Sequence, residues 1–158
     1  MEIELEEKTK KALLWIIEIL NQQKISFQIS GGFAAKLYGS ARSLNDIDID
    51  IPENEFTKIV TEVKGYITFG PRQFKDKKWD IFLMTLNYFG QEIDIGSENF
   101  KIFDSNSKQW LSFSTVPNKV IWMPVAGITV PVIAKEELIH YKSYLDGEHQ
   151  KTDIDTIQ

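Results

Sequence analysis

The sequence predicts a single α/β (α+β) domain over residues 1–158, built on a small mixed β-sheet that is flanked by helices. Segments with helical periodicity interleave with segments in which apolar and polar residues alternate, and this order is typical of a sheet covered by helices. With 158 residues and 42% hydrophobic content, the chain can bury a sizeable core within one domain. We find no internal repeat or low-complexity linker that would divide it.

The first elements follow from hydrophobic periodicity and from glycine. Residues 8–22 carry one apolar stripe at helical spacing and predict a helix. Residues 25–29 alternate between apolar and polar side chains and predict a short strand that ends at the pair Gly31-Gly32. Residues 32–39 then predict a brief helix, so the glycine pair lies where a strand passes into a helix.

The rest of the chain alternates between extended and helical patterns. A strand over residues 46–51 is stopped by Pro52, and residues 53–64 predict a helix. A closing helical segment starts near Lys135 and is broken at Gly147. The further strands that we expect are residues 66–70, 79–89, 92–96, 119–123 and 127–130.

Composition and charge limit the classes of partner. The formal net charge of −5 argues against non-specific binding of nucleic acid through a basic surface. It is compatible with a nucleotide substrate, because a magnesium ion masks acidic side chains and phosphates together. The chain has no cysteine, which excludes disulfides and thiolate zinc sites. A charged N-terminal segment and the lack of a long apolar run lead us to expect a cytoplasmic protein that binds no membrane.

Three acids alternate with isoleucines along the strand predicted over residues 46–51. Side chains at i and i+2 point the same way, so Asp46, Asp48 and Asp50 share one face. Carboxylates this close repel one another, and Mg²⁺, which prefers hard oxygen ligands, relieves that repulsion. The alternative is an edge strand with a solvated acidic face. Because Asp50 lies at the strand end beside Pro52, we expect it to be exposed.

The glycine pair is the second candidate feature. Gly31 and Gly32 precede a short helix, where backbone N–H groups and the helix N-terminus approach an anion closely, and Ser30 adds a hydroxyl. The spacing matches neither a Walker A nor a G-x-G-x-x-G motif. On its own the pair therefore has two readings, a phosphate-binding turn or a plain turn.

The glycine turn and the acidic strand together resemble a known signature. An apolar-x-Gly-Gly turn, thirteen intervening residues and an Asp-Ile-Asp-Ile strand resemble the DNA-polymerase-β-like nucleotidyltransferase superfamily. The resemblance makes Asp46 and Asp48 the paired acids of the signature. Members carry a third carboxylate between apolar residues on a later strand. Asp94 lies between two isoleucines and matches that position, with Glu92 as the reserve.

A finer resemblance covers nearly the whole chain, and it is to the small lincosamide- and aminoglycoside-type (minimal) bacterial nucleotidyltransferases. Arg42, four residues before Asp46, stands where these enzymes often have an arginine. Lys142 and Asp153 match positions in their C-terminal helix pair, whereas Leu44 replaces a frequent Ser or Thr. The resemblance implies the nucleotidyltransferase fold, with a small mixed sheet flanked by helices and a C-terminal helical segment.

The resemblance also implies a reaction. A nucleoside monophosphate moves from a nucleoside triphosphate (NTP) to an acceptor hydroxyl, and pyrophosphate leaves. Asp46, Asp48 and Asp94 would hold two Mg²⁺ ions, and Asp94 would accept the hydroxyl proton as general base. The residues implied to bind the β- and γ-phosphates are Ser30, Gly31, Gly32, Arg42 and Lys142.

The acceptor is left open by these motifs. One candidate is a hydroxyl-bearing small molecule such as a lincosamide or aminoglycoside antibiotic, and another is tRNA or a partner protein, as for toxin–antitoxin enzymes. A non-catalytic nucleotide-binding module of the same fold is the third reading. Base preference and oligomeric state are not determined by a fold resemblance.

Simpler roles stay open for several polar side chains. Arg42 is expected either to contact phosphate or to form a surface ion pair, and Lys142 either to contact a ligand or to lie on a solvated helix face. His140 and His149 lack metal-ligand spacing, so we expect structural or surface roles for them. Most of the aromatic side chains are assigned to the core, with one or two available to wall an acceptor site.

Overall fold

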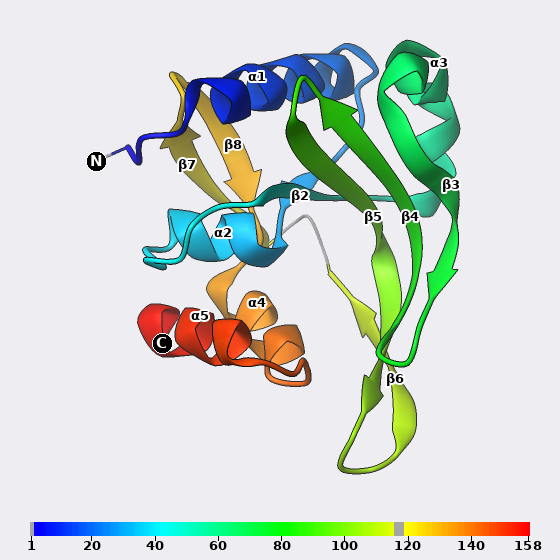
Figure 1. The fold of residues 1–158 in the computed structure, drawn as a ribbon, viewed down its shortest axis with the longest axis vertical. Coiled ribbons are helices and arrows are strands. Elements are labelled where there is room, and N and C mark those ends of the chain that lie inside the picture. The colour runs from blue at the N-terminus through cyan, green and yellow to red at the C-terminus, as the bar shows by residue number, and fades with distance from the viewer. Residues whose placement is uncertain (1, 116–118) are drawn as a thin grey trace.

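One mixed β-sheet organises the fold, as seen in a computed structural model that describes residues 2–115 and 119–158 (Figure 1). The strands are β1 (Gln28–Ile29), β2 (Asp46–Ile51), β3 (Ile67–Lys75), β4 (Trp79–Tyr88), β5 (Gln91–Asp104), β6 (Gln109–Ser114), β7 (Ile121–Val125) and β8 (Ile128–Val132). They lie in the order β3-β4-β5-β2-β1-β8-β7, with β6 paired to β5. The sheet is mixed because β2 pairs parallel to β5 and antiparallel to β1. The expected α/β architecture is confirmed.

Helices cover the sheet and build the C-terminal end of the molecule. They are α1 (Glu7–Gln22), α2 (Gly31–Leu37), α3 (Val60–Val63), α4 (Lys135–Lys142) and α5 (Glu148–Ile157), with 3-10 turns η1 (Glu53–Lys58) and η2 (Lys64–Tyr66). Figure 1 shows α2, α4 and α5 together, away from α1, and these three helices contact one another. None of the helices in the described ranges has the length and apolar character that a membrane crossing requires.

The helix predicted over residues 53–64 is only partly formed. The segment consists of a 3-10 turn and a single α-helical turn, Val60–Val63. Its second half is rich in β-branched side chains, which lose rotamer freedom in a helix and so lower its stability. Phe56, Ile59 and Val63 are nevertheless buried, as the periodicity predicts.

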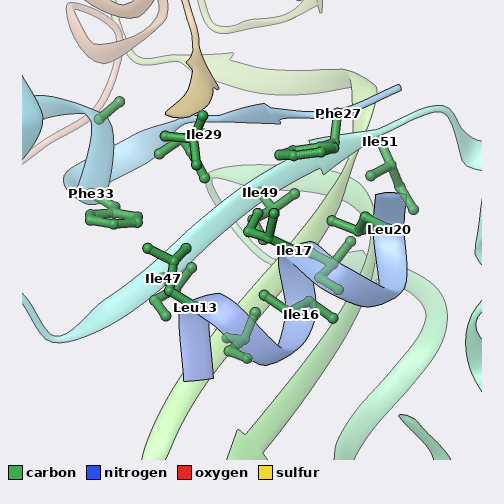
Figure 2. Packing of buried hydrophobic residues seen from close by; sticks show 14 of the residues in the cluster. Leu13, Ile16, Ile17, Leu20, Phe27, Ile29, Phe33, Ile47, Ile49 and Ile51 are labelled. Atoms are coloured by element: carbon green, nitrogen blue, oxygen red, sulfur yellow. The ribbon is translucent and has the colours of Figure 1, made fainter. Parts of the chain in front are cut away.

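The isoleucines of β2 form part of the core. Ile47, Ile49 and Ile51 are at most 1% exposed, and they face the apolar stripe of α1 (Figure 2). The labelled side chains of that stripe are Leu13, Ile16, Ile17 and Leu20. Because side chains alternate along a strand, burial of the isoleucines against α1 presents the three aspartates on the opposite side.

The acidic strand β2 lies in the interior of the sheet, between β1 and β5. The alternative of an edge strand is therefore wrong. The parallel register with β5 places Asp46 beside Glu92 and Asp48 beside Asp94. Two pairs of acids are thus brought onto one face of the sheet by two neighbouring strands.

Long hairpins extend the sheet beyond the predicted strands. β3 continues to Lys75, where the sequence predicts a strand only to residue 70, and it pairs with β4 along its length. β5 is 14 residues long and pairs with β2, β4 and the unpredicted strand β6. Its pairing with β4 shifts register between Ile81 and Leu83. Figure 1 shows these long hairpins projecting past β2, opposite the helices α4 and α5.

Candidate active site

Three carboxylates form a compact cluster on the acidic face. Asp46, Glu92 and Asp94 each offer an oxygen atom, and these oxygens lie within 4.8 Å of one another. None of the ion pairs found in the described part of the chain includes any of the three. The structure therefore brings both the expected third acid, Asp94, and its reserve, Glu92, next to Asp46.

Asp48 lies outside this compact cluster and faces the glycine turn. Its Oδ2 accepts a hydrogen bond from the backbone N–H of Phe33 at 3.4 Å. A Cβ atom on Gly31 would lie 2.5 Å from the same Oδ2, and Gly31 has a φ of +57°. Glycine is required at this position, since a side chain would clash with Asp48 and strain the backbone. The turn and the acidic strand are thus in direct contact.

Burial and the charges of neighbouring acids raise the pKa values of Asp48, Glu92 and Asp94. Burial first, and then the charges of Asp94 and Asp46, raise the pKa of Asp48 to about 8. The same causes raise the pKa of Glu92 to about 7, and burial raises that of Asp94. The charge of Lys142 offsets only part of the rise at Asp48, and no ion pair among the described residues includes any of these acids. A bound cation would reverse the rise.

A second group of charges faces the same region from α4, α5 and the segment before β2. Asp153 is fully buried and accepts hydrogen bonds from Arg42 Nε at 2.8 Å, Arg42 Nη2 at 2.6 Å and Ser40 Oγ at 2.6 Å. Lys142 Nζ lies 3.2 Å from Asp153 Oδ2. Burial alone raises the pKa of Asp153, but its bonds to Arg42 and Ser40 and the charge of Lys142 lower it to about 2.

Neither simpler reading of the two cations holds in full. Arg42 does form an ion pair, but its partner Asp153 is buried rather than on the surface. Lys142 is 3% exposed, so the solvated helix face is wrong. Its Nζ donates to Gln150 Oε1 at 2.7 Å as well as pairing with Asp153. Both cations are held in place by α5.

Two hollows meet over the acidic face. The larger, here called the acidic cleft, has a volume of about 410 Å³. The smaller, here called the cationic hollow, has a volume of about 260 Å³. Five residues line both hollows, and they are Gly32, Asp46, Asp48, Lys142 and Gln150. Glu92 and Asp153 line neither hollow. The other residues proposed as metal or phosphate ligands each line at least one, and these are Ser30, Gly31, Gly32, Arg42, Asp46, Asp48, Asp94 and Lys142.

The two hollows differ in the chemistry of their remaining walls. The acidic cleft is closed by apolar side chains of the hairpins and of α4, and these are Phe74, Trp79, Ile81, Leu83, Phe100 and Tyr141. The cationic hollow is polar, and Arg42 and His149 line it together with Lys142. Because His149 lacks metal-ligand spacing, the sequence predicts only a structural or surface role for it. No sequence signal indicates that it lines the same hollow as Arg42.

Backbone donors at the glycine turn are largely engaged. Ser30 N–H donates to the Asp48 carbonyl at 3.0 Å, and Gly31 N–H donates to Tyr141 Oη at 2.8 Å. Among the described residues, Gly32 N–H has no acceptor assigned to it. Tyr141 is thus a site residue that sequence reasoning missed, because its position in α4 gives no sign that it reaches the turn.

The expectation that Asp50 is exposed is wrong. Its residue is 9% exposed, and its carboxylate accepts hydrogen bonds from three side chains. Two aromatic side chains lie outside the core, since Phe89 is 75% and Trp122 is 64% exposed. Neither of these two lines a hollow described above.

Solved structures share this arrangement of sheet and helices. A provisionally assigned nucleotidyltransferase from Thermotoga maritima aligns with a TM-score of 0.72 at 19% identity, over 89% of this chain and 85% of that chain. The lincosamide antibiotic adenylyltransferase LnuA, in its lincomycin-bound form, aligns with a TM-score of 0.63 at 16% identity, over 98% of both chains. This chain has the nucleotidyltransferase fold. The resemblance inferred from the glycine turn and the acidic strand is confirmed at the level of fold.

Another structure similar to this chain contains a bound small molecule. ANT(2″)-Ia in complex with adenylyl-2″-tobramycin aligns with a TM-score of 0.59 at 14% identity, over 95% of this chain and 90% of that chain. No protein-family profile matches the sequence, and no curated protein does. The likeness is therefore one of structure, and the chemistry has to be argued from the site itself.

Proposed function

We propose that this protein is a Mg²⁺-dependent nucleotidyltransferase, which moves a nucleoside monophosphate from an NTP to an acceptor hydroxyl and releases pyrophosphate. The proposal is carried by the cluster of Asp46, Glu92 and Asp94, whose oxygens lie within 4.8 Å of one another beside the glycine turn. Hard oxygen ligands without a counter-charge suit a hard divalent cation. The nucleotidyltransferases that share the fold support the same class of reaction.

The proposed metal ligands are Asp46, Asp48 and Asp94, with Glu92 as the alternative third acid. Two ions are proposed because one divalent ion does not balance four neighbouring carboxylates. When bound, Mg²⁺ supplies charge neutralisation and orientation for the triphosphate. The raised pKa values of Asp48 and Glu92 fit this assignment, since acids that repel one another in the empty site gain most from a cation.

Asp94 is the proposed general base. Thr85 Oγ1 donates a hydrogen bond to Asp94 Oδ1 at 3.0 Å, which fixes the carboxylate at the wall of the acidic cleft. Asp94 lines the acidic cleft, where the acceptor is proposed to bind, so its carboxylate is placed for proton transfer from the acceptor hydroxyl. The second oxygen is then available to accept the proton of the acceptor hydroxyl.

Arg42, Lys142 and Gly32 are the proposed ligands of the β- and γ-phosphates. All three line the cationic hollow, where two cations and a backbone N–H without an assigned acceptor in the described chain face the paired acids. Ser30 and Gly31 belong to the same proposal. In the structure their hydroxyl and N–H are bonded to Asp50 and Tyr141, so phosphate binding there requires an exchange of partners.

The acceptor is proposed to be a hydroxyl-bearing small molecule, such as a lincosamide or aminoglycoside antibiotic. The acidic cleft has a volume of about 410 Å³, which falls in the range of small-ligand pockets. Lincomycin and adenylyl-tobramycin are the ligands of two proteins that share the fold. Transfer to tRNA, transfer to a partner protein and binding without turnover are outcomes that the following test separates.

The test is nucleotidyl transfer by the purified protein with Mg²⁺ and each labelled NTP. Parallel reactions contain lincomycin, tobramycin, bulk tRNA or no acceptor, and labelled products are separated by mass. Asp46→Asn and Asp94→Asn are expected to lower the rate about 100-fold or more, as for the loss of a main electrostatic group. Glu92→Gln, run beside Asp94→Asn, decides which of the two is the third acid.

Asp155→Asn is the matched control, because Asp155 is an exposed aspartate on α5 with no ion pair among the described residues. Its rate is expected to equal that of the unsubstituted protein. Product formation that survives both Asp46→Asn and Asp94→Asn would remove the proposed site. Mg²⁺-dependent nucleotide binding without product from any acceptor would instead favour the binding module.

A further inference from the structure

Asp50 shares a face with the proposed metal ligands but has a different environment. Its carboxylate accepts three hydrogen bonds, from Gln28 Nε2 at 3.0 Å, from Ser30 Oγ at 2.8 Å and from Thr115 Oγ1 at 3.2 Å. All three donors are neutral, and all three residues are buried. Asp50 is absent from the cluster of described residues whose oxygens converge within reach of one ion. The contacts of Asp50 therefore argue against a role as a metal ligand.

The three donors come from separate parts of the chain. Gln28 belongs to β1, Ser30 precedes α2, and Thr115 follows β6 and is 65 residues from Asp50. A buried carboxylate is costly unless donors satisfy its oxygens. Asp50 is thus the common acceptor that holds β1, the glycine turn and the end of β6 against one point of β2.

Ser30 is fastened to β2 by two bonds. Its backbone N–H donates to the Asp48 carbonyl at 3.0 Å, and its hydroxyl donates to Asp50 Oδ1 at 2.8 Å. Phe33, on the far side of the two glycines, donates its N–H to Asp48 Oδ2 at 3.4 Å. The glycine turn is therefore held at both ends by the strand that carries the proposed metal ligands.

This attachment leaves little freedom for the turn. Gly31 already approaches Asp48 so closely that a Cβ atom would lie 2.5 Å from its Oδ2. Loss of the Ser30–Asp50 bond would release the turn on the side where Gly31 and Gly32 face the two hollows. The Thr115–Asp50 bond, by contrast, fixes the end of β6 and does not touch the turn.

We infer that Asp50 is a positioning residue, which fixes the glycine turn at a set distance from the metal-binding acids through the hydroxyl of Ser30. The inference rests on the proposed function, because the turn is assigned to phosphate there. It also changes the role of Ser30: its hydroxyl serves Asp50 rather than a phosphate oxygen. Asp50 itself touches neither the metal ions nor the nucleotide.

The test compares two variants that each delete one hydroxyl donor to the same carboxylate. Ser30→Ala removes the bond to the turn, and Thr115→Val removes the bond to the end of β6 while it keeps the side-chain shape. Amide hydrogen exchange of the peptide around residues 28–37 is measured without ligand. Binding of α,β-methylene-ATP with Mg²⁺ is measured by calorimetry. Thermal midpoints record the general loss of stability.

Both variants are expected to lower the thermal midpoint to a similar extent. Only Ser30→Ala is expected to speed exchange of residues 28–37 and to weaken nucleotide binding, by about tenfold or more. Equal exchange at the turn in both variants would overturn the inference, because Asp50 would then be a structural residue only. Failure of the unsubstituted protein to bind the nucleotide would count against the proposed function, and the exchange result would still decide the role of Asp50.

Asp50→Ala separates positioning from direct contact of Ser30 with phosphate, because it leaves the Ser30 hydroxyl in place. If Asp50 positions the turn, this variant loses nucleotide affinity as Ser30→Ala does. Unchanged or tighter binding by Asp50→Ala, beside weakened binding by Ser30→Ala, would mean that Ser30 contacts phosphate itself and would overturn the inference. Should Asp50→Ala fail to fold, the pair Ser30→Ala and Thr115→Val still gives the decision.

Discussion

The candidate active site contains carboxylates that the chain treats in opposite ways. On the face shared by β2 and β5, burial and neighbouring acids raise the pKa of Asp48 to about 8 and that of Glu92 to about 7. At Asp153, although burial alone acts in the same direction, bonds from Arg42 and Ser40 and the charge of Lys142 lower the pKa to about 2.

The difference lies in the partners and not in the type of residue. Asp153 is neutralised by the chain itself, so its charge supports the packing of α5 against the segment before β2. The four acids paired across β2 and β5 form no ion pair within the described ranges, so their mutual repulsion opposes folding of the empty protein and they gain from a cation taken from solution. Within one site, the origin of the counter-charge therefore separates structural acids from those proposed to act in catalysis.

The largest effect on stability is expected at the neutralised acid. Asp153→Asn leaves Arg42 and Lys142 without their shared anion in a buried setting, and it should lower the free energy of unfolding by about 3–5 kcal/mol. Urea denaturation measures the change. The exposed neighbour Asp155→Asn on the same helix should stay within about 0.5 kcal/mol. If Asp153→Asn and Asp155→Asn lowered the free energy of unfolding equally, Asp153 would not be a stabilising acid, and its contrast with the acids of β2 and β5 would be lost.

Metal ions should stabilise only the other region. At a hundredfold excess over its dissociation constant, Mg²⁺ should raise the free energy of unfolding by roughly 2.7 kcal/mol, by mass action on the folded state. The double variant Asp46→Asn/Asp94→Asn should show no such gain, whereas Asp155→Asn should keep it. Thermal unfolding with Mg²⁺ and with a chelator measures both. A gain of the same size in the double variant would place the ion elsewhere.

A smaller effect of opposite sign is expected when one of the unpaired acids is neutralised. Folded Asp48 holds a proton that the unfolded chain releases, so the metal-free protein loses stability as pH rises from about 4 towards about 8. Asp153 behaves inversely: its contribution is present above about pH 4 and is lost as pH falls towards about 2. Asp48→Asn should therefore stabilise the metal-free protein by about 1 kcal/mol at pH 8 and flatten the first slope.

Denaturation of Asp48→Asn and the unsubstituted protein across this pH range, in the presence of a chelator, gives the measurement. A loss of stability at pH 8 in Asp48→Asn would show that the bond from Phe33 N–H outweighs the repulsion. In that case Asp48 would stabilise the folded protein, as Asp153 does. The destabilising acids would then be Asp46, Glu92 and Asp94 alone.

Local spacing was enough to predict the acidic face but not its surroundings. The i, i+2 rule placed Asp46 and Asp48 on one side of β2, and the flanking isoleucines singled out Asp94. The buried Asp50 accepts a hydrogen bond from Thr115, which is 65 residues further along the chain. A local sequence pattern cannot predict a partner at that distance. The same holds for Tyr141, whose hydroxyl reaches Gly31 from α4.

The fold was predicted as a class, while its pairing was not. Alternating helices and strands indicated a mixed sheet, but the parallel neighbour of β2 is a strand 40 residues further on, and sequence distance carries no information on that choice. The predicted strands ended at Gly70 and Gly96, because glycine and the following Pro71 read as breaks, so β3 and β5 were both predicted too short. Strand β6 was missed altogether. Arg42, Lys142 and Asp153 were each singled out, yet their mutual ion pairing emerged only from the packing of α5.

The alternation along β2 also protects the spacing of the site. A slip of this strand by one residue would turn three carboxylates towards α1 and three isoleucines towards the cleft. Such a chain could neither fill its core nor ligate a cation. Misregistered forms are therefore unstable and do not accumulate. An insertion within residues 46–51 is consequently lethal to the fold before it is harmful to catalysis, and variation in this protein has to enter through the loops and hairpins around the strand.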